Sequence, residues 1–191
     1  MKYGIKSISM DDIAKNLSIS KKTLYQYVEN KADLVNKIMK TYLEVDKSTI
    51  ETICSDSDNA IEEVVGIFRY FLHKRREFNP SVLYDLKKYY PQSYMLFVSY
   101  KREFMFSKII QNIEAGKNQG FYRRDINSEI MAKVYQASID ALLDTELFPT
   151  REYKFIDLYA ELIRYHLHGI ASEEGLQYLQ TLNPESLYAQ D

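Results

Sequence analysis

The sequence is poor in the residues that build disulfide frameworks, thiolate metal sites and tight turns. Its 191 residues include one cysteine, no tryptophan, four prolines and six glycines. Cys54 cannot form an internal disulfide, which is typical of a reducing compartment. We expect Cys54 to be inert, because reactive thiols need an electropositive setting. The few glycines and prolines fall at intervals that indicate breaks between helices.

Other absences exclude whole classes of protein. No apolar run approaches the roughly 18 residues that a membrane span needs, and no signal peptide opens the chain, so we expect a cytoplasmic location without membrane contact. Glycine-rich phosphate loops, nucleophile elbows and zinc-ligand spacings are missing. His166 and His168 would lie about 200° apart on a helix and cannot share a metal ion. We therefore predict no enzyme, no catalytic residues, no metal and no cofactor.

Charge is divided unevenly along the chain. Residues 1 to 40 hold eight lysines and four acidic residues, a net charge of +4. Residues 41 to 191 hold 17 basic and 23 acidic residues, a net charge of −6. This division indicates that only the N-terminal part meets a polyanion.

Apolar residues recur at helical spacing almost everywhere, and no sustained alternation of period two appears. The predicted fold class is therefore all-α. Capping residues and breakers place the expected helices at 9–17, 20–28, 30–53, 58–73, 80–89, 92–117, 127–147 and 151–168.

The first two expected helices are too short to be stable alone, because isolated helices below about 12 residues are marginal in water. They must pack on each other in helix-turn-helix geometry. The residues expected on their shared apolar side are Ile13, Ala14, Leu17, Ile19, Leu24 and Val28.

The opposite side of the second helix presents groups suited to DNA. Lysine and glutamine can hydrogen-bond base edges in the major groove, while threonine and tyrosine hydroxyls can hold phosphates. The candidates are Lys21, Lys22, Thr23, Tyr25, Gln26, Tyr27 and Lys31. Composition alone leaves an alternative open, in which the lysines are solvated surface and the tyrosines are half-buried core.

Residues 7 to 38, "SISMDDIAKNLSISKKTLYQYVENKADLVNKI", resemble the DNA-binding segment of the TetR family of bacterial transcriptional repressors. The elements "DIA", "SKKTLYQY" and "NKADL" carry the resemblance, and "YHLHGIASEEGL" at 165–176 is similar more weakly to the C-terminal end of some members. The resemblance implies phosphate contacts for Thr23, Tyr25, Tyr27 and Lys31, and groove-facing positions for Lys21, Lys22 and Gln26. It also implies a helix-turn-helix domain at 1–48 and a larger helical-bundle domain for ligand binding and dimerisation at 49–191.

Three departures from the family pattern have expected consequences. Ser18 stands where the family has glycine, and we expect a different turn, because a left-handed conformation costs a residue other than glycine about 1 to 2 kcal/mol. Val28 replaces a phenylalanine and is expected to loosen the packing of the short helices. "MKYGIKS" resembles the end of the family's first helix, most of which is missing, so we expect residues 1–191 to bind DNA poorly.

Aromatic residues gather in the acidic part of the chain, with tyrosines and phenylalanines concentrated after residue 60. In a helical bundle such a cluster can line a pocket for an apolar or aromatic small molecule. The candidate ligand-binding residues are Phe68, Tyr84, Tyr94, Phe97, Tyr100, Phe104 and Tyr135. The family implies an effector whose binding lowers DNA affinity.

The expected helices 127–147 and 151–168 are apolar on more than one side. In the first of them one line holds Ile130, Val134, Ala137 and Ala141, and the other holds Met131, Tyr135, Ile139, Leu142 and Leu143. A helix with two apolar sides needs two partners. The resemblance implies a homodimer through these helices, and the alternative is that both sides are covered within one chain.

The preferred interpretation is a TetR-like regulator, most simply a repressor, that binds palindromic operator DNA as a dimer and is released by a small molecule. Its main alternative is a dimeric helical small-molecule-binding protein without competent DNA binding. A third interpretation is an interaction adaptor that uses the tyrosine-rich surface.

Overall fold

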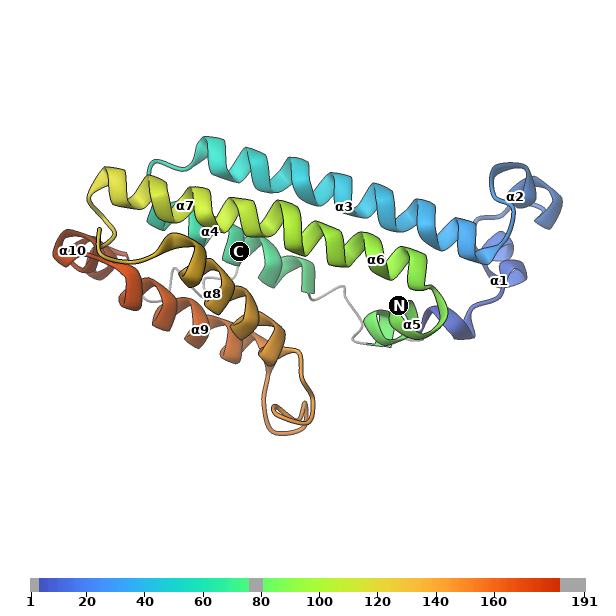
Figure 1. Cartoon of the computed structure of the whole chain (residues 1–191). Helices are drawn as coiled ribbons and strands as arrows, with labels where there is room; N and C mark the ends of the chain where they lie inside the picture. The colour runs from blue at the N-terminus through green and yellow to red at the C-terminus, as the bar shows by residue number, and fades with distance from the viewer. Residues whose placement is uncertain (1–3, 76–80, 183–191) are drawn as a thin grey trace. The chain divides into compact units, whose positions relative to one another are not determined.

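The computed structural model describes residues 4–75 and 81–182 (Figure 1). These residues contain helices joined by turns and no strand beyond an isolated antiparallel bridge between Tyr122 and Ala171, so the all-α prediction is confirmed. None of the helices within these residues combines the length and the apolar content needed to cross a membrane. The elements are η1 (Ile5–Ser7), α1 (Met10–Asn16), α2 (Lys21–Tyr27), α3 (Lys31–Asp56), α4 (Ala60–Arg75), α5 (Ser81–Tyr89), α6 (Pro91–Ser99), η2 (Tyr100–Met105), α7 (Phe106–Gln119), α8 (Ser128–Leu142), α9 (Phe155–Ile170) and α10 (Glu173–Thr181).

Side-chain caps start most of the helices where the sequence predicts. The hydroxyl of Ser20 accepts the backbone N–H of Thr23, and the amide oxygen of Asn127 accepts the backbone N–H of Ile130. Such caps satisfy backbone donors that have no partner in the first turn of a helix. Pro91 occupies the first turn of α6 as expected, while Pro80 lies outside the described residues.

Three expected helices differ clearly from the observed ones, those over 92–117, 127–147 and 151–168. The helix expected over 92–117 is interrupted by the π-helical segment η2, where the hydrogen-bond spacing differs from the α pattern. The helix expected over 127–147 ends at Leu142, because the Asp144 carboxylate accepts the Glu146 N–H in a turn.

The last expected helix, 151–168, is α9, which begins at Phe155 and continues through Gly169 to Ile170. One more helix, α10, follows it and was not predicted. Its N-cap is Ser172, whose hydroxyl accepts the Gly175 N–H at 3.1 Å and donates to the Gly120 carbonyl at 2.6 Å. A short turn capped by Ser172 therefore joins α9 to α10, where the sequence predicted that the last helix ends.

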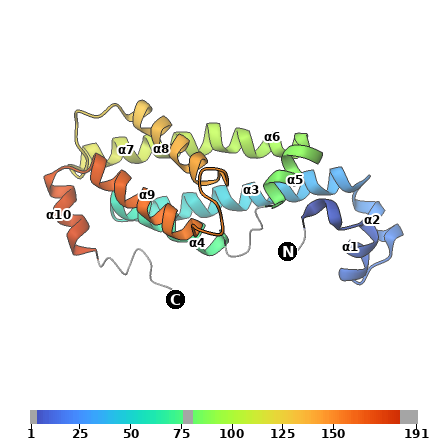
Figure 2. The same cartoon turned by 90° about the horizontal axis from the view of Figure 1, so that it is seen from below.

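The chain divides into two compact units. The first unit comprises residues 1–50 and 73–104, and the second comprises residues 51–72 and 105–191. Within the second unit α7 packs on α8 and α8 packs on α9 (Figures 1 and 2). Its core includes Phe68 and Ile113, both fully buried, together with apolar residues of α8 and α9. The predicted division into a DNA-binding domain at 1–48 and a ligand-binding domain at 49–191 concerns function and stays a prediction.

Candidate nucleic-acid interface

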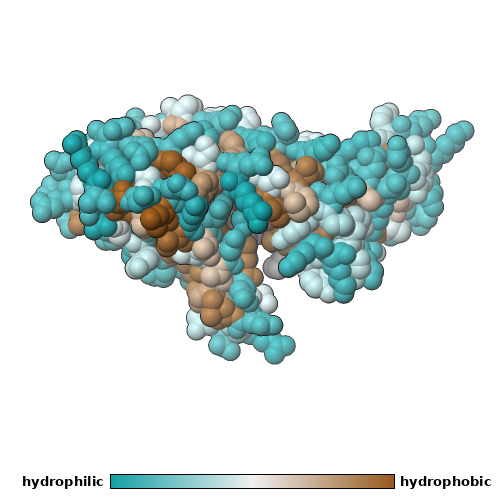
Figure 3. Space-filling model, in the orientation of Figure 1, coloured by the Kyte–Doolittle hydropathy of each residue, from teal (hydrophilic) through white to brown (hydrophobic). Residues whose placement is uncertain are grey.

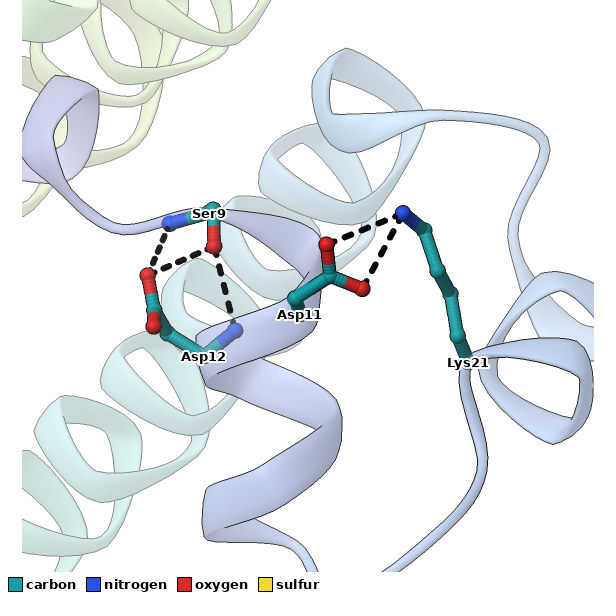
Figure 4. Close-up of polar contacts among 4 residues, drawn as sticks. All are labelled: Ser9, Asp11, Asp12 and Lys21. Carbon is teal, nitrogen blue, oxygen red and sulfur yellow. Dashed lines mark hydrogen bonds and ion pairs between the residues drawn. The ribbon is translucent and has the colours of Figure 1, made fainter.

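Hydrogen bonds at Ser9 fix the start of α1. The hydroxyl of Ser9 accepts the Asp12 N–H at 3.1 Å, and the Asp12 carboxylate accepts the Ser9 N–H at 2.9 Å (Figure 4). This reciprocal arrangement is a capping box, and the Ser9 hydrogen bonds lower the pKa of the Asp12 carboxyl. Asp11, which precedes Asp12 in the first turn of α1, forms a 3.0 Å ion pair with Lys21 at the start of α2 (Figure 4). The two short helices are thus joined by charge as well as by packing.

The turn between α1 and α2 is left-handed at Ser18. Its φ is 55°, so the expectation that serine would force a different turn is wrong. The Ser18 N–H donates to the Lys15 carbonyl at 3.1 Å, and the Ile19 N–H donates to the Ala14 carbonyl at 3.0 Å. These two bonds form a Schellman motif, which satisfies the last carbonyls of α1 and offsets the strain.

The core between the short helices is small. Met10, Ala14, Leu24 and Val28 are buried, and Ile13 and Leu34 pack against them. The prediction was wrong for Leu17, whose side chain is 60% exposed, because the chain leaves the helix at this C-cap residue. Ile19 is 36% exposed and is not among the buried residues of this core. Met10, which was not expected in this core, is buried in it instead. It lies at the N-terminal end of α1, whereas Leu17 follows the C-terminal end.

Most of the residues predicted to bind DNA lie on the outer surface of α2. The side chains of Lys22 and Gln26 are exposed, and those of Tyr25 and Tyr27 are 44% and 72% exposed. Tyr27 is therefore not half-buried core, as the alternative interpretation required, whereas Tyr25 is about half-buried as that alternative expected. The surface over α1 and α2 is largely hydrophilic in the view of Figure 3.

Three candidates carry internal contacts in addition. Lys21 is paired with Asp11, and the Thr23 hydroxyl is 2.8 Å from that of Ser20. Lys31 Nζ donates to the backbone carbonyl of Ile5 at 2.7 Å and to that of Lys6 at 3.2 Å. Lys31 therefore fastens η1 to the start of α3, and a phosphate contact by its ammonium has to compete with these bonds.

The sequence interpretation missed Lys37. Its Nζ donates to the Tyr27 carbonyl at 2.7 Å and to the Asp33 carboxylate at 3.0 Å. The first contact places a positive charge at the C-terminus of α2, where the helix dipole is negative. The i, i+4 spacing of Asp33 and Lys37 on α3 is the one signal in the sequence that pointed to this residue.

The two units differ in net charge more than residues 1–40 and 41–191 do. The first unit holds sixteen Lys and Arg residues and nine Asp and Glu residues, a net charge of +7. The second unit holds nine basic and eighteen acidic residues, a net charge of −9. The helix-turn-helix thus belongs to a strongly basic unit that includes α5 and α6, far along the chain.

The candidate ligand-binding residues fall in both units. Tyr84, Tyr94, Phe97, Tyr100 and Phe104 belong to the first unit, and Phe68 and Tyr135 belong to the second. The rings of Tyr100 and Phe104 stack at 5.4 Å between centroids, whereas the side chain of Tyr84 is 59% exposed. Phe68 and Tyr135 share the core of the second unit. Their ligand role stays a prediction.

Polar groups are buried in the second unit. The His166 ring stacks on Tyr135 at 4.1 Å, and burial lowers the pKa of His166 to about 4. Burial also raises the pKa of Tyr159 to about 12. The pKa of Cys54 is raised to about 12, first by burial and then by the negative charge of Glu63. The thiol therefore stays protonated, as expected for an inert cysteine.

Helix α8 has one buried and one exposed apolar line. Met131, Tyr135, Ile139 and Leu142 belong to the core of the second unit or pack against it. Ile130 and Val134 are 58% and 49% exposed, and Figure 3 shows apolar residues at the surface along α8. The alternative prediction was that one chain covers both apolar sides of this helix. Among the described residues of the second unit, the side with Ile130 and Val134 stays exposed.

Comparisons with known proteins agree with the motif and the fold. Residues 1–38 match the family described as bacterial regulatory proteins, tetR family. The chain is 24% identical over 169 residues to the uncharacterized HTH-type transcriptional regulator YvaF of Bacillus subtilis, and the match covers 88% of each chain.

Solved structures show the same fold at low sequence identity. A transcriptional regulator from Cytophaga hutchinsonii has a TM-score of 0.72 at 17% identity, over 89% of this chain and 91% of that one. A protein from Saccharomonospora viridis, solved in complex with choline, has a TM-score of 0.62 at 17% identity, over 88% of this chain and 90% of that one. The family predicted from residues 7–38 is the one whose description matches residues 1–38.

Proposed function

We propose that this chain, a transcriptional regulator of the TetR family, binds palindromic operator DNA as a homodimer and is released from it by a small molecule. The observation that carries the proposal is the outer face of α2, where Lys22, Gln26 and Tyr27 are exposed on a helix fixed by α1. An exposed helix with these side chains matches the major groove in shape and hydrogen-bonding groups. This role implies a cytoplasmic location, because the operator DNA of a bacterium lies in the cytoplasm.

The candidate residues make two kinds of contact with DNA. Lys22 and Gln26 read base edges, together with Lys21 once its ion pair with Asp11 opens. Thr23, Tyr25 and Tyr27 hold phosphates on either side of the groove, and Lys31 does so in competition with its bonds to the Ile5 and Lys6 carbonyls. The net charge of +7 on the first unit supplies the sequence-independent part of the affinity.

Dimerisation is supported by the exposed line of α8. Ile130, Val134 and Ala137 are exposed, and a second copy of the same face would bury them by two-fold symmetry. A dimer also provides two recognition helices for two half-sites about one helical turn, or a multiple, apart. Repression follows if the operator overlaps a promoter.

Release by a ligand requires differential affinity for two states of the protein. The structurally similar protein from Saccharomonospora viridis holds choline, which supports a small-molecule effector for this fold. The candidate contacts in this chain are the aromatic residues named above, and an apolar or aromatic effector suits them.

The test is fluorescence anisotropy with duplexes from the palindromic sequence nearest the protein's own gene. We expect the chain to prefer the palindrome over a scrambled duplex, and Gln26→Ala to lower that preference by about tenfold, the size of one bidentate base contact. The matched control is Gln92→Ala, an exposed glutamine of α6 in the same unit.

Equal affinity of the wild-type chain for palindrome and scrambled duplex would favour the alternative, a dimeric helical small-molecule-binding protein. A chain that forms no dimer and binds no small molecule would favour the adaptor. The expectation that residues 1–191 bind DNA poorly stays a prediction, and the absolute affinity from the same titration measures it.

A further inference from the structure

Two lysines and two tyrosines form a cluster on η1 and α5. Lys6 Nζ donates to the Tyr89 hydroxyl at 3.1 Å and lies 4.4 Å from the centre of the Tyr89 ring. Lys88 Nζ donates to the Tyr84 hydroxyl at 2.8 Å and lies 5.5 Å from the centre of the Tyr89 ring. Two ammonium groups therefore flank one exposed phenol, and we call these four residues the lysine–tyrosine cluster.

The ammonium groups of this cluster, those of Lys6 and Lys88, have no ion-pair partner among the described residues, 4–75 and 81–182. Other lysines of the first unit do have such partners, as Lys21 has Asp11. Asp85 is the acidic group in contact with Lys6, but it is buried and accepts the Lys6 backbone N–H. The cluster therefore attracts an anion from outside.

The groups in the cluster suit a phosphate diester. Two ammonium groups supply charge, and the two tyrosine hydroxyls can donate hydrogen bonds to phosphate oxygens. The hydrogen bond and positive charge from Lys6, and the positive charge of Lys88, lower the pKa of the Tyr89 hydroxyl, which reflects the same concentration of positive potential. A bound phosphate would replace the phenol oxygens as the acceptor of both ammonium groups.

The cluster is tied to the helix-turn-helix through η1. Lys6 lies in η1, and only Ile8 and Ser9 separate η1 from α1. Lys31, at the start of α3 and just after α2, donates to the carbonyls of Ile5 and Lys6. Both contacts lie within the first unit, with its net charge of +7.

From this placement we infer that the lysine–tyrosine cluster binds phosphates of the DNA backbone flanking the base pairs that α2 reads. The inference rests on the proposed function and adds to it a contact from α5, a helix about 60 positions beyond the recognition helix. Its consequence is a longer DNA footprint and a steeper dependence of affinity on salt.

The test compares Lys88→Gln with its neighbour Lys87→Gln, which removes the same charge from the same helix outside the cluster. Anisotropy is measured at about 50 and 200 mM salt on a long duplex, about 40 base pairs, and on a short duplex that holds the palindrome alone. Removing one phosphate contact lowers the slope of log affinity against log salt by about 0.9. Lys6→Gln combined with Lys88→Gln should therefore lower the slope by about 1.8 and the affinity by about tenfold on the long duplex.

We expect Lys87→Gln to stay within about twofold of the wild type, because it removes no phosphate contact. On the short duplex the double variant should match the wild type. An unchanged slope and affinity of the double variant on the long duplex, or an equal loss of affinity in Lys87→Gln, would overturn the inference. So would a double variant that keeps its DNA affinity and loses binding to vesicles of anionic lipid.

Failure of the proposed function gives a different result. A wild-type chain that does not prefer the palindrome would contradict operator recognition, while the salt slopes on a scrambled long duplex would still report the phosphate contacts. A wild-type chain that binds no duplex at all would overturn both. Circular dichroism of each variant confirms that the exposed substitutions leave the helices intact.

Discussion

The backbone N–H of Lys6 donates to the carboxylate of Asp85 at 2.9 Å, across 79 positions of the chain. The bond joins η1, at the start of the basic unit, to a buried side chain of α5. We predict that Asp85→Ala lowers the free energy of unfolding by about 1 to 3 kcal/mol, the usual loss for a hydrogen bond to a charged group. Urea unfolding followed by circular dichroism measures the change.

Asp85→Asn is the matched control for this bond, because its amide oxygen can still accept the Lys6 N–H. It should lose less stability than Asp85→Ala. Hydrogen exchange of the Lys6 amide should accelerate in Asp85→Ala alone, and equal exchange in the two variants would show that the bond does not hold η1 in place.

Two helical glycines predict opposite effects of adding one methyl group. A Cβ at Gly116 would lie 2.1 Å from a ring carbon of Tyr122, which is itself buried and hydrogen-bonded to the Ala60 carbonyl. Gly116→Ala should therefore lower the free energy of unfolding by about 1 to 3 kcal/mol, as overpacking does. A Cβ at Gly169 would meet no atom within 4 Å, and Gly169→Ala should raise it by about 0.5 to 1 kcal/mol.

Thermal unfolding of the two variants beside the wild type checks this pair. Each variant controls the other, since both place alanine inside a helix of the second unit. A gain in stability for Gly116→Ala would mean that Tyr122 does not pack where the structure places it.

The burial of His166 predicts that the stability of the chain depends on pH. Burial lowers its pKa to about 4 from the ordinary 6.5, so the folded chain disfavours the protonated ring. Between about pH 6.5 and pH 4 the unfolded chain binds a proton that the folded chain does not. The free energy of unfolding should therefore fall by about 3 kcal/mol as the pH decreases through this interval, and this contribution is constant above it.

Urea midpoints from pH 7 to pH 4 measure the slope. His166→Phe keeps a ring against Tyr135 and should remove the His166 part of the slope, whereas His168→Gln, at an exposed position of α9, should retain it. The same slope in His166→Phe and the wild type would assign the pH dependence to other groups.

The exposed line of α8 predicts the effect of a charge on assembly. In the proposed two-fold dimer, Val134→Glu would place like charges against each other, so the dissociation constant of that dimer should rise at least about 100-fold. Sedimentation equilibrium measures it. Val45→Glu is the matched control, because Val45 is 56% exposed on α3 of the other unit. Equal behaviour of the two variants would place the dimer interface elsewhere.

The features that local chemistry decides could be read from the sequence. Ser9 and Ser20 were expected to cap α1 and α2, because a cap is a contact over three positions. The two apolar lines of α8 followed from periodicity. Ser18 shows where this reasoning fails, since a local penalty predicted another turn while two backbone hydrogen bonds hold the left-handed one.

Other features depend on contacts that no local pattern contains. The π-helical segment η2 carries apolar residues that fit an uninterrupted α-helix equally well. Whether Lys31 meets a phosphate or a carbonyl depends on η1, 25 or 26 positions earlier. Leu17 was expected inside because its spacing from Ala14 is helical, but the chain turns at that residue. The lysine–tyrosine cluster likewise needs η1 and α5 to meet.

The opposite charges of the two units bear on how the protein approaches DNA. A net charge of +7 on one unit and −9 on the other means that a polyanion pulls on the first and pushes on the second. If the chain binds DNA as proposed, the basic unit that carries α2 is favoured in the encounter with the duplex, and contact through the acidic unit is disfavoured. On the proposed function, the basic unit would thus supply attraction to DNA although the net charge of the whole chain is −2, and the acidic unit would limit binding of the chain to DNA in other orientations.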